Sequence, residues 1–406
     1  MASTPTPPRH HLPLYLISCL MAFIGGHMLN YSIIFIALER FDSHALAGIG
    51  YGLCFGPPLI FGWFAGVFCD RYPPRRVILI FQNSYLLALL ILYFSTFAAI
   101  EAQPFLLLLA AFFSGIGWSF VAPARFATLP FYVTPQKLTG ASITLNMMVM
   151  MGFGLAPMLL KQIQFYFHWH AVFWVCMVLF VCSSILLLPL RFSFQSQPTE
   201  KVLQEIKASL RFVKQSNFLK PLLVLSGITY LLMGPMQVIL PSIAQNTLHL
   251  SPTGQGHYMS LIALALMLGG LSAMWLKNKG RIGAKTLLAI AFAGLGIGYL
   301  SLESSLRLSV LALLFAGICG GIGVSFIVAG LQAYSPDHYR GKIMSFYSMI
   351  SQIVPAASGV GAGIIAQVFS PEAALQTFSA LILLGTLCCW FLLPHFRKLE
   401  QFQHAV

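Results

Sequence analysis

Two polar side chains that can exchange protons or hydrogen bonds lie in the first long apolar stretch of the chain, residues 13–37. His27 and Asn30 are three residues apart, so on a helix they share roughly one face. Histidine changes its charge near neutral pH, which makes His27 a candidate for carrying a coupling proton. A hydrogen-bonded packing histidine is an equally good interpretation, and both stay open.

Two cations, Arg125 and Lys161, also fall inside apolar stretches. A charge within a membrane is costly, so each side chain must face a cavity or a partner. Arg125 is either a substrate or coupling group, or the structural partner of Asp70 or of a helix end; we favour the structural role. Lys161 either lines a pathway or extends to the outer interface, and we favour the interface. Further candidates for a polar cavity are Gln237, Gln332, Tyr347 and Gln352.

The acids are placed differently from these cations. None of the ten lies deep inside an apolar stretch: Glu39, Asp42, Glu101, Glu303 and Glu372 fall on the predicted outer side, and Asp70, Glu200, Glu205, Asp337 and Glu400 on the inner side. A carrier of cationic drugs normally needs a buried carboxylate to offset the charge of its ligand. Because the embedded charges are positive, the sequence predicts a small anionic or neutral polar substrate.

The sequence lacks the common motifs of catalysis and metal binding. Its eight cysteines form no C-x-x-C pair, and seven of them fall inside apolar stretches, which indicates buried free thiols. Neither H-E-x-x-H nor G-x-S-x-G occurs, nor does a G-x-x-x-x-G-K-S/T loop for ATP. We expect no catalytic residue, metal or cofactor, and we disfavour the competing class of an intramembrane enzyme or receptor.

The composition indicates which solvent surrounds the elements that carry these residues. Hydrophobic residues make up 58% of the 406 and charged residues 8%, and the mean hydropathy is +0.82. A soluble domain carries about 25% charged residues, so lipid suits this chain better than water. The net charge of +13 does not indicate nucleic acid, because the cations lie in short gaps between apolar stretches.

Twelve apolar stretches approach the length of about 20 residues that a bilayer crossing needs. They are residues 13–37, 45–68, 77–99, 104–131, 141–163, 170–190, 221–245, 256–276, 285–302, 307–332, 343–368 and 372–394. Every backbone amide must be paired within hydrocarbon, so these stretches predict helices. The sequence therefore predicts an all-α membrane protein.

The cations also predict the orientation of these helices. With the N-terminus inside, 19 of the 23 Lys and Arg residues lie on the cytoplasmic side, and only Arg40 and Arg307 lie outside. Cytoplasmic loops of membrane proteins carry such an excess of Lys and Arg. We therefore expect both termini in the cytoplasm.

The longest gap between apolar stretches divides the chain near its middle. Residues 191–220 contain apolar side chains at helical spacing among Lys and Glu, which predicts an amphipathic helix on the inner membrane surface. It is either a tether between two domains, which we favour, or a plain spacer. We expect an N-terminal six-helix bundle over 1–190 and a C-terminal one over 221–406.

A short repeat supports this division. Pro135 and Gly140 recur as Pro336 and Gly341, in each case 201 residues later. Each pair follows the stretch that occupies the same place in its half, the fourth and the tenth. The repeat therefore indicates two related halves with parallel topology.

The loop after the second stretch carries the most specific motif. Residues 62–76 read GWFAGVFCDRYPPRR, which resembles the helix 2–3 loop signature of the major facilitator superfamily, G-x-x-x-D-R-x-x-R-R/K. In that superfamily the loop acts as a latch on the outward-open state, and the alternative is simple anchoring of the arginines at the inner surface. The resemblance implies a latch made of Gly62, Gly66, Asp70, Arg71, Arg75 and Arg76; in the second half Lys277 replaces the acid.

Two further motifs refine the resemblance. The P-A-R-x-x-x-L-P run at 123–130 is similar to the bacterial branch of enterobactin-exporter-like and macrolide-efflux-like proteins, and that similarity covers essentially the whole chain. Exporters of the superfamily often carry G-x-x-x-G-P-x-x-G-G in helix 5. Here Gly152 and Pro157 match, whereas Ala156 replaces a glycine, so the match to the antiporter motif is partial.

These observations and the resemblance imply a major facilitator fold of twelve transmembrane helices in two six-helix bundles. We expect a monomeric secondary transporter in the bacterial inner membrane, working by alternating access and exporting a small anionic metabolite such as a carboxylate siderophore. Proton coupling is a further expectation, and nucleic acid is not an expected partner. Proton-coupled multidrug efflux and uptake in the opposite direction remain the alternatives.

Overall fold

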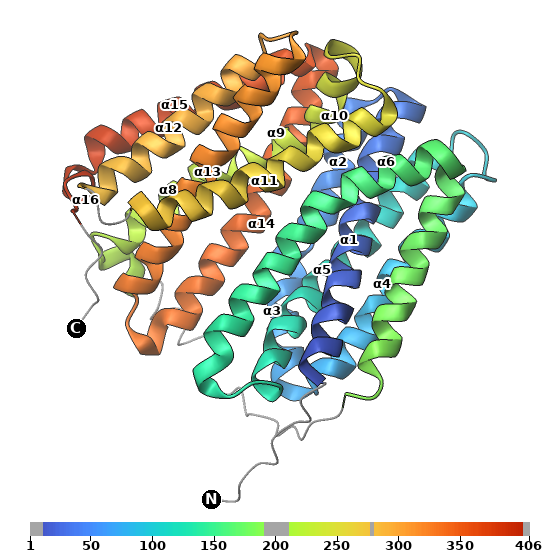
Figure 1. Ribbon diagram of the computed structural model, residues 1–406, viewed down its shortest axis with the longest axis horizontal. Coiled ribbons are helices and arrows are strands. Elements are labelled where there is room, and N and C mark those ends of the chain that lie inside the picture. The colour runs from blue at the N-terminus through green and yellow to red at the C-terminus, as the bar shows by residue number, and fades with distance from the viewer. Residues whose placement is uncertain (1–10, 191–210, 277–279, 401–406) are drawn as a thin grey trace, which may run out of the picture. The chain divides into compact units, whose positions relative to one another are not determined.

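The computed structural model describes residues 11–190, 211–276 and 280–400, and over these residues all regular elements are helices (Figure 1). The chain forms two compact units. Unit 1 comprises Met1–Ala37 and Leu53–Thr199, and unit 2 comprises Leu38–Gly52 and Glu200–Val406. Most of the predicted amphipathic helix of 191–220 lies outside the described residues.

Eleven helices in the described part of the chain are long and apolar enough to cross a membrane. One of these stretches, Gly140–Leu187, has 48 residues, more than twice the length of about 20 that one crossing needs. It belongs to α6 (Pro135–Leu187), which is interrupted at His168 by a non-helical φ of 63° and ψ of 179°. Figure 1 shows α6 folding back on itself. Counted as two crossings, α6 brings the total to the predicted twelve, and the predicted all-α fold is confirmed.

Unit 1 is built from closely packed helices. Its other elements are α1 (His11–Phe41), α3 (Pro58–Arg71), α4 (Pro74–Ser95), α5 (Gln103–Thr128) and the short η1 (Leu129–Phe131). A Cβ added to Gly117 of α5 would lie 2.8 Å from the Tyr85 ring of α4, and one added to Gly152 of α6 would lie 2.9 Å from the Phe23 backbone of α1. Glycine at these positions lets helices approach in the way that membrane packing favours.

The second predicted helix, 45–68, is interrupted. It forms α2 (His44–Phe55) and α3, which are separated at Gly56 and Pro57. Pro57 and Pro58 have no amide hydrogen to donate to the preceding turn, so the helical ladder cannot continue through them. The prediction of one continuous helix is wrong at this point.

The first nine residues of α2 belong to unit 2, together with α14 (Asp337–Val368). A Cβ added to Gly48 would lie 2.7 Å from the carbonyl oxygen of Gly359 and 3.0 Å from the Cα atom of Gly363. The two helices therefore meet backbone to backbone. This contact explains why Leu38–Gly52 groups with unit 2, at a different place from the predicted bundle boundary.

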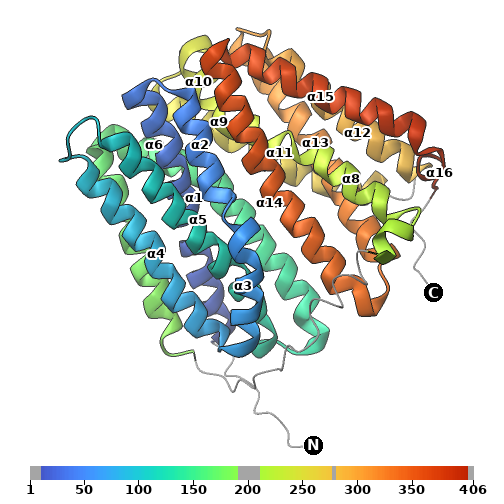
Figure 2. The same cartoon turned by 180° about the vertical axis from the view of Figure 1, so that it is seen from behind.

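Unit 2 contains the remaining helices, and Figure 2 shows them from the side opposite to that of Figure 1. They are α8 (Leu219–Tyr230), α9 (Met233–Val238), α10 (Leu240–Ser242), the π-helical turn η2 (Ile243–Thr247), α11 (Pro252–Leu276), α12 (Ile282–Leu300), α13 (Leu306–Tyr334), α14, α15 (Pro371–Leu392) and α16 (Pro394–Arg397). The predicted helix 221–245 is thus broken into four pieces. Pro235 and Pro241 each remove a backbone donor within it, which interrupts the ladder.

The C-terminal segment closes one end of unit 2. The amide of Gly283, at the start of α12, donates to the carbonyl of Leu399 over 3.2 Å, and the amide of Ile282 donates to the carbonyl of Glu400 over 3.4 Å. The first amides of a helix have no partner within the helix. A Cβ on Gly283 would lie 1.8 Å from the Phe396 carbonyl oxygen, so only glycine fits this contact.

The end of the predicted linker packs on unit 2. Phe212 stacks on Tyr339 with ring centroids 5.3 Å apart, and Phe218 stacks on Tyr334 at 4.6 Å. Val213 between them is buried. Residues 211–220 are therefore held against the loop region between α13 and α14.

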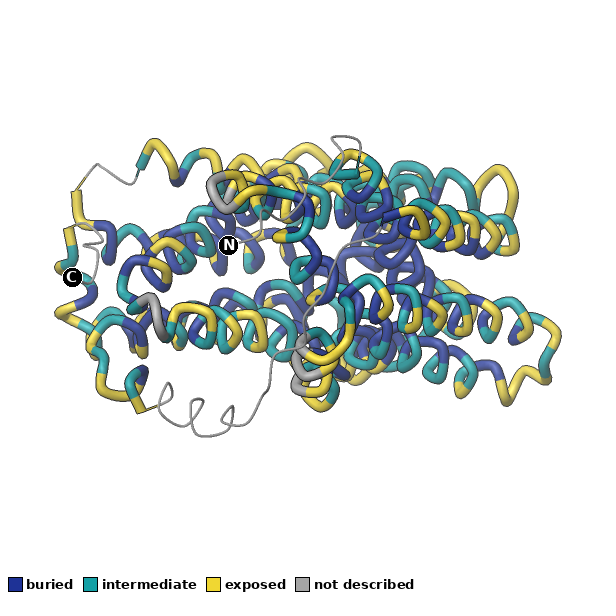
Figure 3. Tube along the Cα trace, turned by 90° about the horizontal axis from the view of Figure 1, so that it is seen from below, coloured by how far each residue is buried: buried dark blue, intermediate teal, exposed yellow. Residues whose placement is uncertain are grey.

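Large apolar side chains also lie on the outside of the helices. Trp275 is 82% exposed and Leu392 is 77% exposed, and Figure 3 shows exposed positions alternating with buried ones along individual helices. Such surfaces are unfavourable in water but suit a chain whose helices lie in lipid.

Candidate substrate and coupling residues

His27 lies on α1 among aromatic rings of unit 1. It is 6% exposed, and its ring centroid lies 5.7 Å from that of Trp118 on α5 and 5.6 Å from that of Phe153 on α6. Its Nε2 atom is buried without a hydrogen-bond partner among the described residues. The histidine is therefore packed between rings, and one of its polar atoms is left unsatisfied.

Asn30 lies one turn further along α1 and is also buried, with 5% of its surface exposed. Its Oδ1 atom accepts a hydrogen bond from the Ser114 hydroxyl of α5 over 2.7 Å. This bond uses the acceptor of the amide, and the Nδ2 hydrogens remain as donors. The sequence placed His27 and Asn30 on one face, and both are buried in the structure.

Arg125 is fully buried in unit 1 and is surrounded by neutral hydrogen-bond acceptors. Its Nη2 donates to Gln82 Oε1 over 2.8 Å and to Ser183 Oγ over 2.9 Å. Its Nη1 donates to Cys19 Sγ over 3.1 Å and to Ser18 Oγ over 3.3 Å. These bonds join α5 to α1, α4 and α6, which agrees with a structural role.

The neighbours of Arg125 extend this network. Tyr15 donates a hydrogen bond to the backbone carbonyl of Arg125, and Gln82 Nε2 donates to the Phe180 carbonyl of α6 over 2.8 Å. Asp70, one of the two structural partners considered from the sequence beside a helix end, has a side chain outside the described part of the structure. The sequence did not predict Gln82, Ser18 and Ser183 as the acceptors of Arg125. A polar residue in an apolar stretch indicates that it has a partner but not which residue that partner is.

Lys161 is buried, with 1% of its surface exposed. Its Nζ atom lies 4.0 Å from the centroid of the Phe35 ring on α1, which is close enough for a cation–π interaction. The favoured prediction that Lys161 extends to the outer interface is therefore wrong. The aromatic face of α1 offers the ammonium a partner inside unit 1, which the sequence of α6 alone does not reveal.

The four candidates of unit 2 differ in their surroundings. The Tyr347 hydroxyl lies 2.7 Å from the Tyr230 hydroxyl of α8, and Gln352 donates to Ser348 of its own helix over 3.4 Å. Gln237 on α9 is 7% exposed, whereas Gln332 on α13 is exposed. The structure thus pairs Tyr347 with a tyrosine that the sequence analysis missed.

The predicted latch is only partly described. Arg75 donates to the carbonyl of Leu188, just after the end of α6, over 2.5 Å, a favourable place for a cation because helix C-termini carry partial negative charge. Arg71 and Arg76 are exposed. A Cβ on Gly62 would have only Pro58 of its own helix within 4 Å among the described residues. The side chains at 66 and 70 are not described, so the latch stays a prediction.

A polar cluster in unit 2 was not predicted. His44 Nε2 lies 2.9 Å from Ser242 Oγ, which also accepts from Asn246 Nδ2 over 3.2 Å. Thr247 Oγ1 donates to Glu372 Oε1 over 3.4 Å. Ser242, Asn246 and Thr247 lie in or next to the π-helical turn η2, a geometry often found at functional sites.

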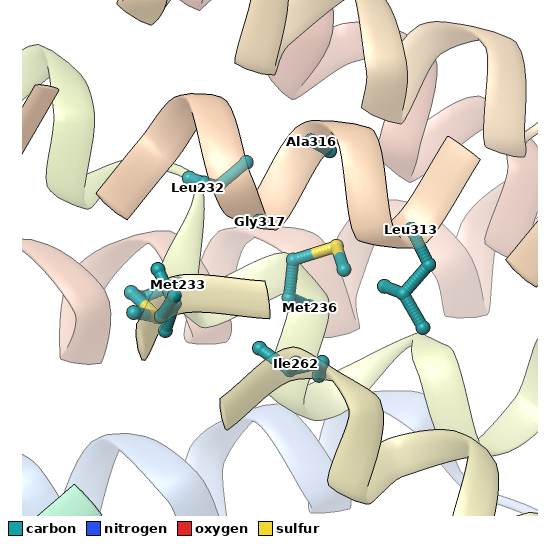
Figure 4. Close-up of a pocket in the computed structure, with 8 residues that line it drawn as sticks. Leu232, Met233, Met236, Ile262, Leu313, Ala316 and Gly317 are labelled. Atoms are coloured by element: carbon teal, nitrogen blue, oxygen red, sulfur yellow. The ribbon is translucent and has the colours of Figure 1, made fainter. Parts of the chain in front are cut away.

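Unit 2 also contains a small apolar cavity, drawn in Figure 4. Its volume is about 10 Å³, and its lining includes Leu232, Met233, Met236, Ile262 and Leu313. A cavity of this size holds about one water-sized sphere. It is a packing gap beside the broken helix, too small for a metabolite. The described residues contain no group of three or more His, Cys, Asp or Glu side chains that could hold a metal ion.

The candidate membrane helices of the described residues, with α6 counted as two crossings, define an all-α multi-pass membrane protein. Residues 54–405 match the family of transmembrane secretion effectors, and the chain belongs to this family of the major facilitator superfamily. No curated protein matches the chain.

Several solved transporters share the fold. A peptide transporter in complex with sulfate is 14% identical, with a TM-score of 0.77 and 98% of each chain covered. A bacterial homologue of the human lysosomal transporter Spinster, in an inward-facing, unoccupied conformation, is 15% identical, with a TM-score of 0.75 over 96% of this chain and 98% of that one. The nucleoside transporter NupG is 13% identical, with a TM-score of 0.73 over 95% and 99%.

Proposed function

We propose that this protein is a secondary active transporter that works by alternating access and exports a small anionic metabolite, a carboxylate siderophore being our first choice. The observation that carries the proposal is the sign of the charges within the membrane helices. Arg125 and Lys161 are both buried, and none of the ten acids of the chain falls deep inside a predicted membrane crossing. Buried cations without embedded acids favour an anionic ligand over a cationic one.

The two cations both contribute to this preference. Arg125 is fully buried and both of its terminal nitrogens already donate to neighbouring side chains, so it acts on an anion through the electrostatic potential of unit 1 and not by direct contact. Lys161 is also buried, and its Nζ atom lies over the Phe35 ring of α1. Its charge adds to the positive potential that an anion meets in unit 1.

The remaining parts of the proposal follow from the sequence. We propose that both termini lie in the cytoplasm, on the basis of the cation distribution. We also propose a monomer in the bacterial inner membrane. Within the family of secretion effectors we propose the enterobactin-exporter-like and macrolide-efflux-like branch. His27 is the candidate for proton coupling, since no other histidine lies near the middle of a predicted crossing.

Two alternatives share the same fold. Proton-coupled multidrug efflux agrees with the aromatic surroundings of His27, since rings offer apolar contact to varied drugs. Uptake of a metabolite would use the same residues in the opposite direction. The absence of acids from the middle of the apolar stretches favours an anion over a cationic drug. It is the same for either direction of transport, which the experiment below distinguishes.

The test is metabolite profiling of the spent medium of a deletion strain under iron limitation. Loss of one secreted chelator, restored by the wild-type gene, would identify both the substrate and the direction. An unchanged set of secreted anions would reject anion export. Accumulation of a cationic dye in the same strain would instead favour multidrug efflux.

A further inference from the structure

The middle of α1 has open space beside a buried backbone. Gly26 is buried, yet a Cβ added to it would have no atom within 4 Å, apart from its immediate neighbours and its own helical backbone. The nearby Gly152, by contrast, would meet Phe23 at 2.9 Å. The backbone of unit 1 is therefore closely packed at Gly152, whereas open space lies beside the buried Gly26.

Two polar groups flank this space. Asn30 is one turn from Gly26 on the same side of the helix, because residues four apart lie nearly above one another. Its Oδ1 accepts one hydrogen bond from Ser114, and its Nδ2 atom supplies two donor hydrogens. His27 is adjacent, and its Nε2 is buried without a partner among the described residues.

A buried polar atom without a hydrogen bond is costly, by about 1–3 kcal/mol. In the tautomer that carries the proton on Nε2, His27 is a donor like the Asn30 amide. Two neighbouring donors fit the oxygens of one carboxylate or carbonyl group. The Trp118 ring lies 5.7 Å from the imidazole between centroids, and an aromatic ring of this kind suits the apolar part of such a ligand.

We infer that Gly26, His27 and Asn30 form a substrate subsite that binds a carboxylate or carbonyl group by hydrogen bonds from His27 Nε2 and Asn30 Nδ2, with the attached apolar group against Trp118. This inference rests on the proposed anion export and names the group that is recognised. Neutral donors select an acceptor oxygen, and the cations of unit 1 add the preference for negative charge.

The repeat of 201 residues gives a comparison within the chain. It relates Gly26 to Gly227 of α8, whose added Cβ would likewise meet nothing within 4 Å. The positions that correspond to His27 and Asn30 are Ile228 and Leu231. The pair of donors at the positions of His27 and Asn30 therefore has no counterpart at the corresponding positions of unit 2.

The test uses the full-length protein in lipid nanodiscs, with radiolabelled benzoate as a planar carboxylate probe and benzylamine as its cationic counterpart. We expect saturable binding of benzoate and not of benzylamine. Each of His27→Phe and Asn30→Leu should weaken benzoate binding by about tenfold, the equivalent of one hydrogen bond to a charged group. Gly26→Leu should fold, because it fills open space, and should abolish binding.

Gly140→Leu is the matched control, since Gly140 also has nothing within 4 Å but lies far from this site in the sequence; it should bind benzoate as the wild type does. If Gly26→Leu does not fold, His27→Phe and Asn30→Leu carry the test. Absence of saturable benzoate binding, equal binding of benzylamine, or binding unchanged in both variants would overturn the subsite. Profiling of the spent medium tests export separately. If the protein exports an anion but His27→Phe and Asn30→Leu bind benzoate as the wild type does, the subsite is rejected and the proposed export stands.

Discussion

Arg125 and Gln82 are joined by a hydrogen bond of 2.8 Å from Nη2 to Oε1, which connects α5 to α4 inside unit 1. Gln82 is itself fixed by its bond to the Phe180 carbonyl of α6. A fully buried guanidinium is thus held by neutral acceptors. Arg125 therefore organises the helices around it, and its removal should affect folding before it affects substrate selection.

Replacement of Arg125 by Met should destabilise the protein. It removes four hydrogen bonds between helices and leaves Gln82 and Ser183 without their charged donor, at a cost of about 2–5 kcal/mol. We expect Tm in detergent to fall by about 5–10 °C, measured by intrinsic fluorescence. Arg76→Met, at an exposed arginine, is the control. If Arg125→Met loses transport while its Tm is unchanged, Arg125 acts on the substrate and not on stability.

Lys161→Met should act on transport more than on stability. The substitution keeps an unbranched apolar chain beside Phe35 and removes the charge 4.0 Å from the ring centroid. We expect export of the anionic substrate to fall by about tenfold, the equivalent of 1.4 kcal/mol, with Tm nearly unchanged. Lys161→Arg should retain export because it keeps the charge over the ring. Full export by the Met variant would contradict an electrostatic role for Lys161.

Gly48→Ala should destabilise the contact between α2 and α14. The new methyl group would lie 2.7 Å from the Gly359 carbonyl oxygen and 3.0 Å from the Gly363 Cα atom. Both are backbone atoms, which cannot rotate away. Overpacking of this kind costs about 1–3 kcal/mol, which thermal unfolding would detect. Gly140→Ala, a helical glycine with no neighbour within 4 Å, is the matched substitution. Equal Tm values for the two variants would show that the helices separate without cost.

Gly283→Ala should displace the C-terminal segment from α12. The added methyl group would overlap the Phe396 carbonyl, at 1.8 Å, and would break the bond from the Gly283 amide to Leu399. We expect faster hydrogen–deuterium exchange at 394–400 and at the start of α12. Gly341→Ala, with open space around it, should leave this exchange unchanged. Unaltered exchange in Gly283→Ala would mean that the segment is not anchored by these amides.

The sequence predicted the membrane-spanning helices because each one is recognised by the summed hydropathy of a whole stretch, which does not depend on neighbouring helices. The low charge content and the long apolar stretches predicted an all-α membrane protein, and the observed helices agree within a few residues for most stretches. The fold-back at His168 was also anticipated, since 141–163 and 170–190 were separated. The breaks at Pro57 and Pro235 were not, because each proline lies in a stretch whose summed hydropathy still suffices for one crossing.

The polar residues were found by the sequence, but their partners were not. A polar side chain in an apolar stretch is visible one residue at a time, so His27, Asn30, Arg125 and Lys161 were all identified. Which acceptor each one meets depends on the rotation of its helix and on the neighbours that pack against it. The acceptors of Arg125, the ring beneath Lys161 and the open space at Gly26 are relations between helices, and for that reason only the tertiary structure decided them.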